Sequence, residues 1–105
     1  MVETQLYFGL DKPSGGPVSA EQFDEFLRTF VSERFPDGLT SVVARGQWRD
    51  VRTKKIVSED SRMLVLVHDG GADAERKVTE IVEQYKRAYE QQAVMRVDAA
   101  VRVRF

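Results

Sequence analysis

The most informative run in the chain is Ser61-Arg62-Met63-Leu64-Val65-Leu66-Val67-His68. Side chains alternate between the two faces of a β-strand, so the unbroken apolar residues from Met63 to Val67 predict a strand that is apolar on both faces. The glycine-rich Asp69-Gly70-Gly71 then ends the strand. A sheet that contains such a strand needs cover on both of its faces.

Three further strands are predicted around this run. The first, Leu6 to Leu10, is rich in aromatic residues, and the second, Leu39 to Trp48, is β-branched and roughly alternating. The run itself continues a strand that starts at Thr53, with a β-bulge expected near Glu59-Asp60. The last strand, Val94 to Phe105, is expected to place Met95, Val97, Ala99, Val101, Val103 and Phe105 on one face and Arg96, Asp98, Arg102 and Arg104 on the other.

Two helices are predicted between the strands. Ser19 and Gln22 have the spacing of a capping box, which marks the start of the first helix. This helix ends before Pro36, because the residue before a proline is pushed out of helical conformation. The second helix is expected from about Ala72 or Asp73 to Glu90, where apolar residues recur at helical spacing.

The resulting order, β-α-β-β-α-β, predicts a ferredoxin-like α+β fold. We expect a single domain over residues 1–105, with a four-stranded antiparallel sheet and both helices on one face. The other face then leaves Met63 to Val67 without cover, which favours a homodimer formed by two sheets packed face to face. The alternative is that long neighbouring side chains, such as Tyr7 and the arginine stems, cover this strand.

The composition restricts the possible chemistry. The chain has 105 residues, of which 42% are hydrophobic, with one histidine, no cysteine and a net charge of −1. These counts exclude a disulfide framework, thiol catalysis, Cys-ligated metals and multi-histidine centres, so we expect no metal and no cofactor. The balanced charge argues against a nucleic-acid partner. No segment approaches the ~20 apolar residues of a membrane span.

One candidate binding run is Gly46-Gln47-Trp48-Arg49-Asp50. A tryptophan flanked by the amide of Gln47 and the guanidinium of Arg49 could wall a pocket and stack on a planar ligand. Alternatively, Trp48 fills a core edge or a dimer seam. Arg45, Arg49, Arg52, Lys54 and Lys55 make this hairpin basic, and together with Arg96 they could bind an anion or simply form a solvated edge.

His68, which precedes a glycine turn, is the candidate general base, although a lone histidine in this position is more often a surface or capping residue. No serine has the context of a nucleophile elbow, so a hydrolase triad has no support. An RNA-recognition domain shares the β-α-β-β-α-β order, and Leu6-Tyr7-Phe8-Gly9-Leu10 resembles its first motif. The third strand lacks the aromatic residues that would stack on bases, so we exclude that role.

Two functions are compatible with these features. The first is a ligand-binding or assembly module that dimerises through its sheet. The second is a small dimeric enzyme of the α+β-barrel type, monooxygenase- or isomerase-like, with His68 or Glu59 as acid or base and an aromatic or anionic substrate. A cavity shared by Tyr7, Trp48 and His68 would be needed for the enzyme. The candidate ligand-binding residues are Tyr7, Gln47, Trp48, Arg49, Glu59, His68 and Arg96.

Four segments form an ordered pattern along the chain: Leu6 to Leu10, Arg34-Phe35-Pro36-Asp37-Gly38-Leu39-Thr40, Gly46-Gln47-Trp48-Arg49 and Ser61 to His68. In this order they resemble a small bacterial family, domain of unknown function 3574. The resemblance covers nearly the whole chain, implies no activity, and singles out Arg34, Gln47, Trp48 and Glu59. Many family members begin with an export signal or lipoprotein leader, which this N-terminus lacks. We therefore expect a cytoplasmic protein as the chain stands, or an exported one if a leader precedes it.

Overall fold

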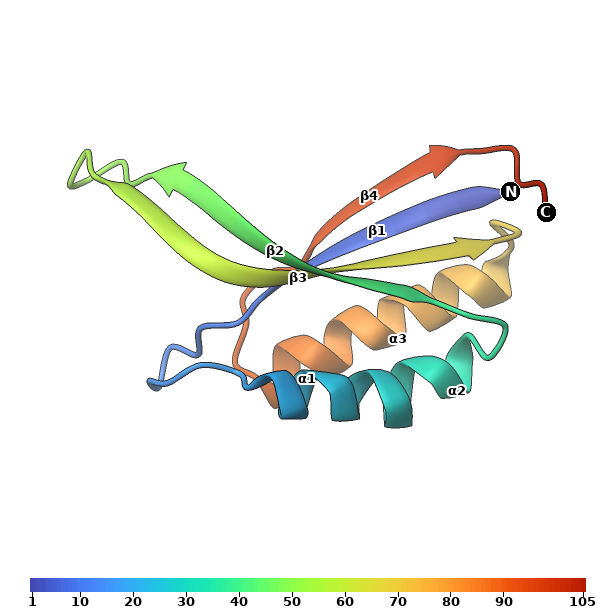
Figure 1. Ribbon diagram of the computed structural model, residues 1–105, viewed down its shortest axis with the longest axis horizontal. Coiled ribbons are helices and arrows are strands. Elements are labelled where there is room, and N and C mark those ends of the chain that lie inside the picture. Colours follow the sequence, from blue (N-terminus) through green and yellow to red (C-terminus); the bar gives the residue numbers. More distant parts are fainter.

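The computed structural model describes residues 1–105 and contains one four-stranded antiparallel sheet with its helices on one face (Figure 1). The strands are β1 (Val2–Gly9), β2 (Thr40–Arg49), β3 (Ile56–His68) and β4 (Met95–Ala100), in the spatial order β2-β3-β1-β4. This confirms the predicted β-α-β-β-α-β order. The doubly apolar strand, β3, lies inside the sheet, beside β1.

The first helical segment consists of α1 (Ala20–Phe26), the π-helical turn η1 (Leu27–Val31) and α2 (Ser32–Arg34). The predicted capping box is present, because the Gln22 amide donates to Ser19 Oγ at 3.0 Å and the Ser19 amide donates to Gln22 Oε1 at 2.9 Å. The segment ends at Phe35, as expected from Pro36. The second helix, α3 (Ala72–Ala88), is slightly shorter than predicted.

The core between helices and sheet is built around an aromatic cluster. Phe8 of β1 contacts Phe23, Phe26 and Tyr85, with ring centroids 4.6 to 6.1 Å apart. The Tyr85 hydroxyl donates a 2.6 Å hydrogen bond to the Gly9 carbonyl, so the one polar atom of this cluster is satisfied. Leu6, Leu64 and Leu66 complete the layer beneath the helices.

The strand register separates the sheet residues into two faces. Thr4, Leu6 and Phe8 of β1 point toward the helices and are buried. Their sequence neighbours point to the opposite side, which no helix covers and which we call the open face. The open face carries Glu3, Gln5 and Tyr7 from β1, Met63, Val65 and Val67 from β3, Met95, Val97 and Ala99 from β4, and Thr40, Val42 and Ala44 from β2.

The charged side of β4 faces the helix layer, which corrects the interpretation of these residues as a solvated edge. Arg96 pairs in register with the buried Leu6, and Asp98 pairs with the buried Thr4. Arg96 is held there by Glu75 of α3 at 2.7 Å and by Asp98 at 2.9 Å. The apolar side of β4 is therefore the one left on the open face, so the uncovered apolar surface is wider than β3 alone.

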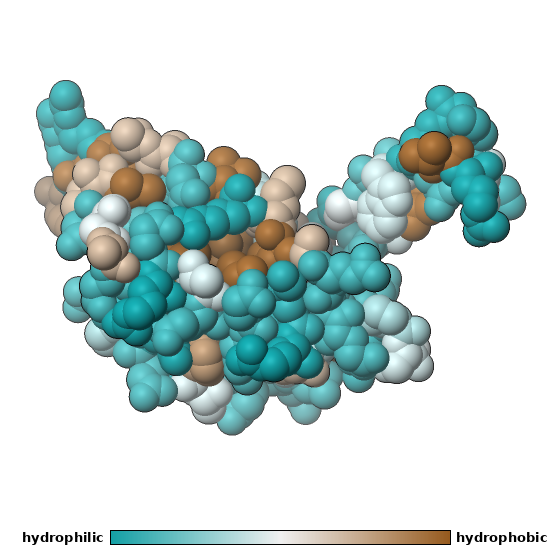
Figure 2. Space-filling model, turned by 180° about the vertical axis from the view of Figure 1, so that it is seen from behind, coloured by the Kyte–Doolittle hydropathy of each residue, from teal (hydrophilic) through white to brown (hydrophobic).

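The far halves of β2 and β3 leave the body as a twisted hairpin, residues 44–61, which we call the arm (Figure 1). Figure 2 shows it projecting from one end of a molecule whose longest extent is 45 Å. The register is one to one from Thr40↔Val65 to Arg49↔Ile56, so the bulge predicted near Glu59-Asp60 is wrong. The β4 strand also ends earlier than predicted, although the Val101 amide still donates to the Met1 carbonyl at 3.0 Å.

Candidate functional site

A pocket of about 400 Å³ lies at the end of the molecule opposite the arm, and we call it the end pocket. Its walls come from four places: Met1 before β1, the turn after α2, the end of β3 and the first turns of α3. The chain reversal at Pro36 and the Asp69-Gly70-Gly71 turn bring these segments together. Its polar lining consists of Arg34, Asp37, His68, Asp69, Asp73 and Lys77.

Arg34 is fixed by the helix from which it projects. Its guanidinium stacks 3.6 Å above the Phe30 ring, and Nη1 donates to the Phe30 carbonyl at 3.1 Å. Nε is buried, makes no hydrogen bond, and lies 3.5 Å from a carboxylate oxygen of Glu80. Arg34 is therefore a rigid and already partnered cation in the pocket wall.

The remaining charges leave the pocket richer in unpaired carboxylates than in free cations. Lys77 Nζ lies 3.1 Å from Asp73 Oδ2, and Arg76 together with Lys77 holds the pKa of Asp73 below its ordinary value. Asp69 accepts from the Gly71 amide at 2.8 Å, whereas Asp37 has no hydrogen-bond or ion-pair partner. The geometry suits a ligand that brings a positive charge toward Asp37 and Asp69.

His68 is buried and both of its ring nitrogens are engaged by this chain. The Gly70 amide donates to Nδ1 at 3.0 Å, so the ring proton is assigned to Nε2, which donates to Thr4 Oγ1 at 2.8 Å. Thr4 in turn donates to Asp98 Oδ1 at 2.5 Å. In this arrangement His68 has no free lone pair with which to take a proton from a ligand.

Asp98 ends this chain of hydrogen bonds. The Thr4 hydroxyl and the Arg96 guanidinium hold the pKa of Asp98 below its ordinary value, even though desolvation acts in the opposite direction. The carboxylate therefore stays ionised and fixes Thr4 as a donor, which leaves the Thr4 oxygen free to accept from His68. The row Asp98–Thr4–His68 joins three strands, and its effect is to position the His68 ring beside Phe35 at the pocket wall.

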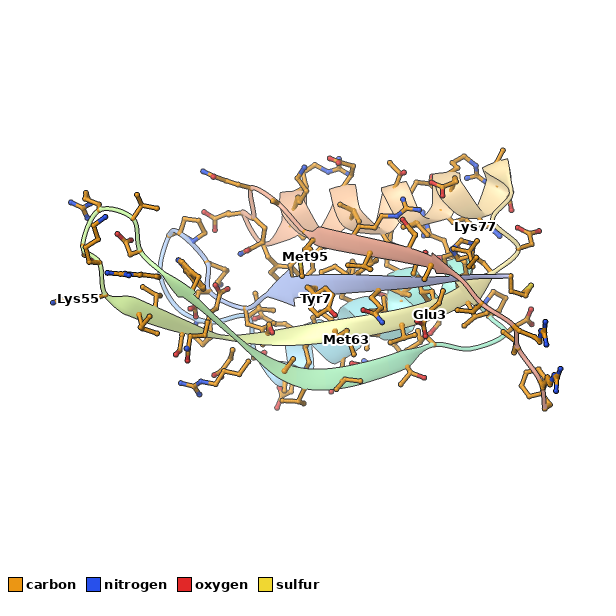
Figure 3. The ribbon with its side chains drawn as sticks, turned by 90° about the horizontal axis from the view of Figure 1, so that it is seen from above. Glu3, Tyr7, Lys55, Met63, Lys77 and Met95 are labelled. Carbon is orange, nitrogen blue, oxygen red and sulfur yellow. The ribbon has the colours of Figure 1, made fainter.

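The open face forms a second candidate site (Figure 3). Tyr7, Met63 and Met95 come from three adjacent strands and lie on it together. At its end nearest the end pocket the face deepens into a depression of about 580 Å³, which we call the hollow. The hollow is mostly apolar; its lining includes Met1, Leu39, Val65, Val67, Val103 and Phe105.

The candidate ligand-binding residues do not share a pocket within one chain, so the shared cavity that the enzyme alternative requires is not formed. Tyr7 lies in the middle of the open face, opposite Met63, and its hydroxyl donates to Gln5 Oε1 at 2.8 Å. Trp48 lies in the arm opposite Val57, with Gln47 and Arg49 beside it. His68 ends β3 at the other end of the molecule, and Arg96 is tied to α3.

Glu59 is placed by a close backbone approach. Its carboxylate lies directly over Gly9, where an added Cβ would collide with it. Below the same glycine, burial raises the pKa of Tyr85, and the nearby Tyr89 hydroxyl and Glu59 carboxylate add to this effect. Glu59 thus closes the junction between arm and body, and no pocket lies beside it.

Sequence reasoning missed the end pocket as a unit. Arg34 and His68 stood out individually, but Asp37, Asp73 and Lys77 did not. The available signal was the placement of two chain reversals, Pro36-Asp37-Gly38 and Asp69-Gly70-Gly71, at the same end of an antiparallel sheet. Thr4 gave no signal, since only the strand register places it between His68 and Asp98.

The fold and the site define a small α+β domain with one apolar sheet face left open. Residues 3–105 match the family described as Protein of unknown function (DUF3574), and the chain belongs to this family. A search of curated proteins found no match. No helix in the structure is long and apolar enough to cross a membrane.

Two solved structures share the fold. A phage SAM lyase in complex with S-methyl-5′-thioadenosine superposes with a TM-score of 0.68 at 18% identity, covering 93% of this chain and 79% of that chain. A phage SAM lyase in the apo state gives a TM-score of 0.63 at 20% identity, with 93% and 78% covered. At this identity the similarity establishes the common architecture.

Proposed function

We propose that this protein is an assembly module that forms a homodimer through the open face of its sheet. The observation that carries the proposal is the apolar surface that β3 and β4 leave on this face, on either side of Glu3, Gln5 and Tyr7 of β1. Val67, Met95 and Val97 are each two-fifths or more exposed, whereas Leu6, Phe8, Leu64 and Leu66 on the helix side of β1 and β3 are fully buried. Exposed apolar surface of this kind is unfavourable in a monomer and favours association.

The open face also lacks the features by which edge and surface strands resist association. Its strands are paired without a bulge, and Glu3 is the single charged side chain among the β1, β3 and β4 residues that form it. Two copies related by a two-fold axis would each cover the other's face with the same residues, which is the commonest symmetry of soluble oligomers.

The test is the mass of the protein in solution, measured by light scattering or sedimentation. We expect a dimer at micromolar concentration for the wild-type chain and a monomer for Val97→Glu, which places a charge on the apolar side of β4. Val43→Glu is the matched control, because Val43 is 78% exposed but points to the opposite side of the sheet. A monomeric wild-type chain, or a dimer unaffected by Val97→Glu, would refute the proposal.

We further propose, as a second function, that the end pocket binds a small molecule that carries a cationic group. Asp37 and Asp69 support this proposal, since Arg34 and Lys77 are already paired with carboxylates of the chain. The shared fold with a lyase that binds S-methyl-5′-thioadenosine makes sulfonium and thioether nucleosides the first compounds to examine. An enzymatic role would require His68 to exchange one of its internal hydrogen bonds for the substrate.

Thermal denaturation with two added compounds tests this second function. S-adenosylmethionine carries a sulfonium cation and S-methyl-5′-thioadenosine does not, so we expect the former to raise the melting temperature more. Asp37→Asn is expected to abolish the difference, whereas Glu21→Gln, an exposed carboxylate on α1 outside the pocket, is expected to preserve it. Equal shifts by both compounds, or none, would count against a cation-binding pocket.

A further inference from the structure

We infer that the arm of each protomer seats Trp48 in the hollow of a second copy of this chain. The inference rests on the proposed function, because it assumes that open faces meet, and it adds a specific and reciprocal contact to that interface. The occupant of the hollow is therefore a tryptophan supplied by the partner, and the hollow is incomplete without it.

Trp48 is poised for such a contact. Its position in β2 alternates with Val42 and Ala44, so it lies on the open-face side of the sheet, opposite Val57. The side chain is 48% exposed and has no aromatic partner within its own chain. Tryptophan buries more surface than any other side chain and is enriched at the centres of protein interfaces, so leaving it half exposed on a projecting hairpin is costly.

The hollow offers the complementary shape and chemistry. It is about 580 Å³ in volume and continuous with the open face through Val65 and Val67. Leu39, Val103 and Phe105 supply further apolar wall, and Phe105 is fully exposed in the isolated chain. A cavity of this size is within the range that accepts an aromatic group.

An arm cannot fill the hollow of its own chain. Trp48 pairs with Val57, whereas the hollow begins at Val65, so the two are separated by about 25 Å along β3 at the usual strand rise. A two-fold axis between the open faces and perpendicular to the strands reverses the strand direction in the partner. When this axis passes midway between Trp48 and the hollow, each arm lies over the other copy's hollow, and the contact is made twice.

Area considerations favour a contribution from the arm. The part of the sheet above the helices is about 20 Å wide and about 25 Å long, a footprint of about 500 Å². Each partner in a stable complex usually buries roughly 800 Å² of accessible surface. The arm bends away from the helix layer, toward the open-face side (Figure 1), and is therefore in position to extend the contact.

Charged residues contribute less to this contact, because attractive and repulsive pairs are both present. Arg49, Arg52, Lys54 and Lys55 at the arm tip form no ion pair within the chain, and the unpaired Asp37 lines the hollow. Arg102 and Arg104 alternate along the chain with the apolar lining residues Val103 and Phe105, and their positive charges repel the cations of the arm. The burial of Trp48 therefore drives the contact, and we expect added salt to change the dimer dissociation constant little.

The first experiment uses Trp48 itself, which is the only tryptophan in the chain. Its fluorescence in the wild-type dimer should be blue-shifted relative to the monomeric Val97→Glu variant, and dilution of the wild type should move the emission toward that of the variant. Trp48→Ala should raise the dimer dissociation constant by roughly 30-fold or more, the loss typical of a buried tryptophan hot spot.

The second experiment uses the absence of cysteine, which makes engineered thiols unambiguous. A chain carrying Val57→Cys and Val103→Cys keeps Trp48 and should form intermolecular disulfides under mild oxidation. The matched control is Ile56→Cys with Val103→Cys, because Ile56 is adjacent but lies on the other side of the arm. We expect the control to crosslink much more slowly.

The outcomes separate the two proposals. A dimer that dissociates with Val97→Glu, but shows unshifted Trp48 emission and no preference for the Val57–Val103 disulfide, would refute the arm contact and leave the open-face dimer standing. A wild-type monomer at all accessible concentrations would refute both. A blue shift on association together with the preferred disulfide would establish the contact.

Discussion

The two faces of the sheet differ although the same strands build them. The helix face is closed by an aromatic cluster and by a polar row, Asp98–Thr4–His68, in which each donor finds an acceptor. The open face has no cover, and its hydrogen bonds run only along β1, from Tyr7 to Gln5 and from Gln5 to Glu3. The helix face therefore carries the stability of the single chain, whereas the open face is available for association.

The largest expected difference is between substitutions at two adjacent residues, Phe8 and Tyr7, which lie on opposite faces. Phe8→Ala removes the centre of the aromatic cluster and should lower the free energy of unfolding by about 3–5 kcal/mol. Tyr7→Ala should cost less than about 1 kcal/mol in a dilute, monomeric sample, as is usual for surface changes. Urea denaturation measures both, with Phe8→Leu available if Phe8→Ala fails to fold. Similar losses at the two positions would contradict the comparison.

A smaller effect is expected from the phenol beneath Gly9. Tyr85→Phe leaves the partly buried Gly9 carbonyl without its donor and should lower the free energy of unfolding by about 1–3 kcal/mol. Because burial raises the pKa of Tyr85, only the unfolded chain ionises near the ordinary value, so wild-type stability should fall as the pH rises above about 10. Tyr85→Phe should lack this part of the alkaline fall. Tyr89→Phe removes a hydroxyl that makes only a long bond at 3.4 Å, and it serves as the control for the lost hydrogen bond at neutral pH.

The smallest effect concerns the polar row of the helix face. The pKa of Asp98 is lower in the folded chain than in the unfolded one, so its contribution to stability is present at neutral pH and is lost as the pH falls below about 4. Asp98→Asn should therefore flatten the acid limb of the stability curve. Asp60→Asn, at an exposed surface ion pair, should leave that limb unchanged.

The sequence predicted those features that depend on local or periodic signals. The capping box at Ser19, the helix end before Pro36 and the order of helices and strands along the chain all follow from nearby residues, and the structure confirms them. The charges of Arg96 and Asp98 predict a β4 face that meets solvent or an anionic ligand. Only the pairing with β1 and the contact with Glu75 show that they face the helices.

The candidate site was harder to predict because it depends on distance along one strand. Trp48 and His68 both belong to conspicuous motifs. Trp48 pairs with Val57 near the start of β3, whereas His68 ends the same strand, so the two residues lie at opposite ends of the molecule. The end pocket combines residues whose individual contexts are ordinary turns and helix starts. The chemistry of the pocket depends on which side chains pair, because the salt bridges of Arg34 and Lys77 leave Asp37 and Asp69 without a cationic partner. No periodic pattern in the sequence encodes such pairing.

The placement of β1 between β3 and β4 has a consequence for how the chain reaches its native state. β1 is the first strand in the sequence and β4 the last element, and Val2 pairs with Ala100. Until β4 arrives, β1 presents an unpaired strand edge directly beside the apolar residues of the open face. Pairing over such a sequence separation is slow, and partly folded chains of this kind aggregate readily. The period before the last strand docks is therefore when the newly made protein most needs protection from its own copies.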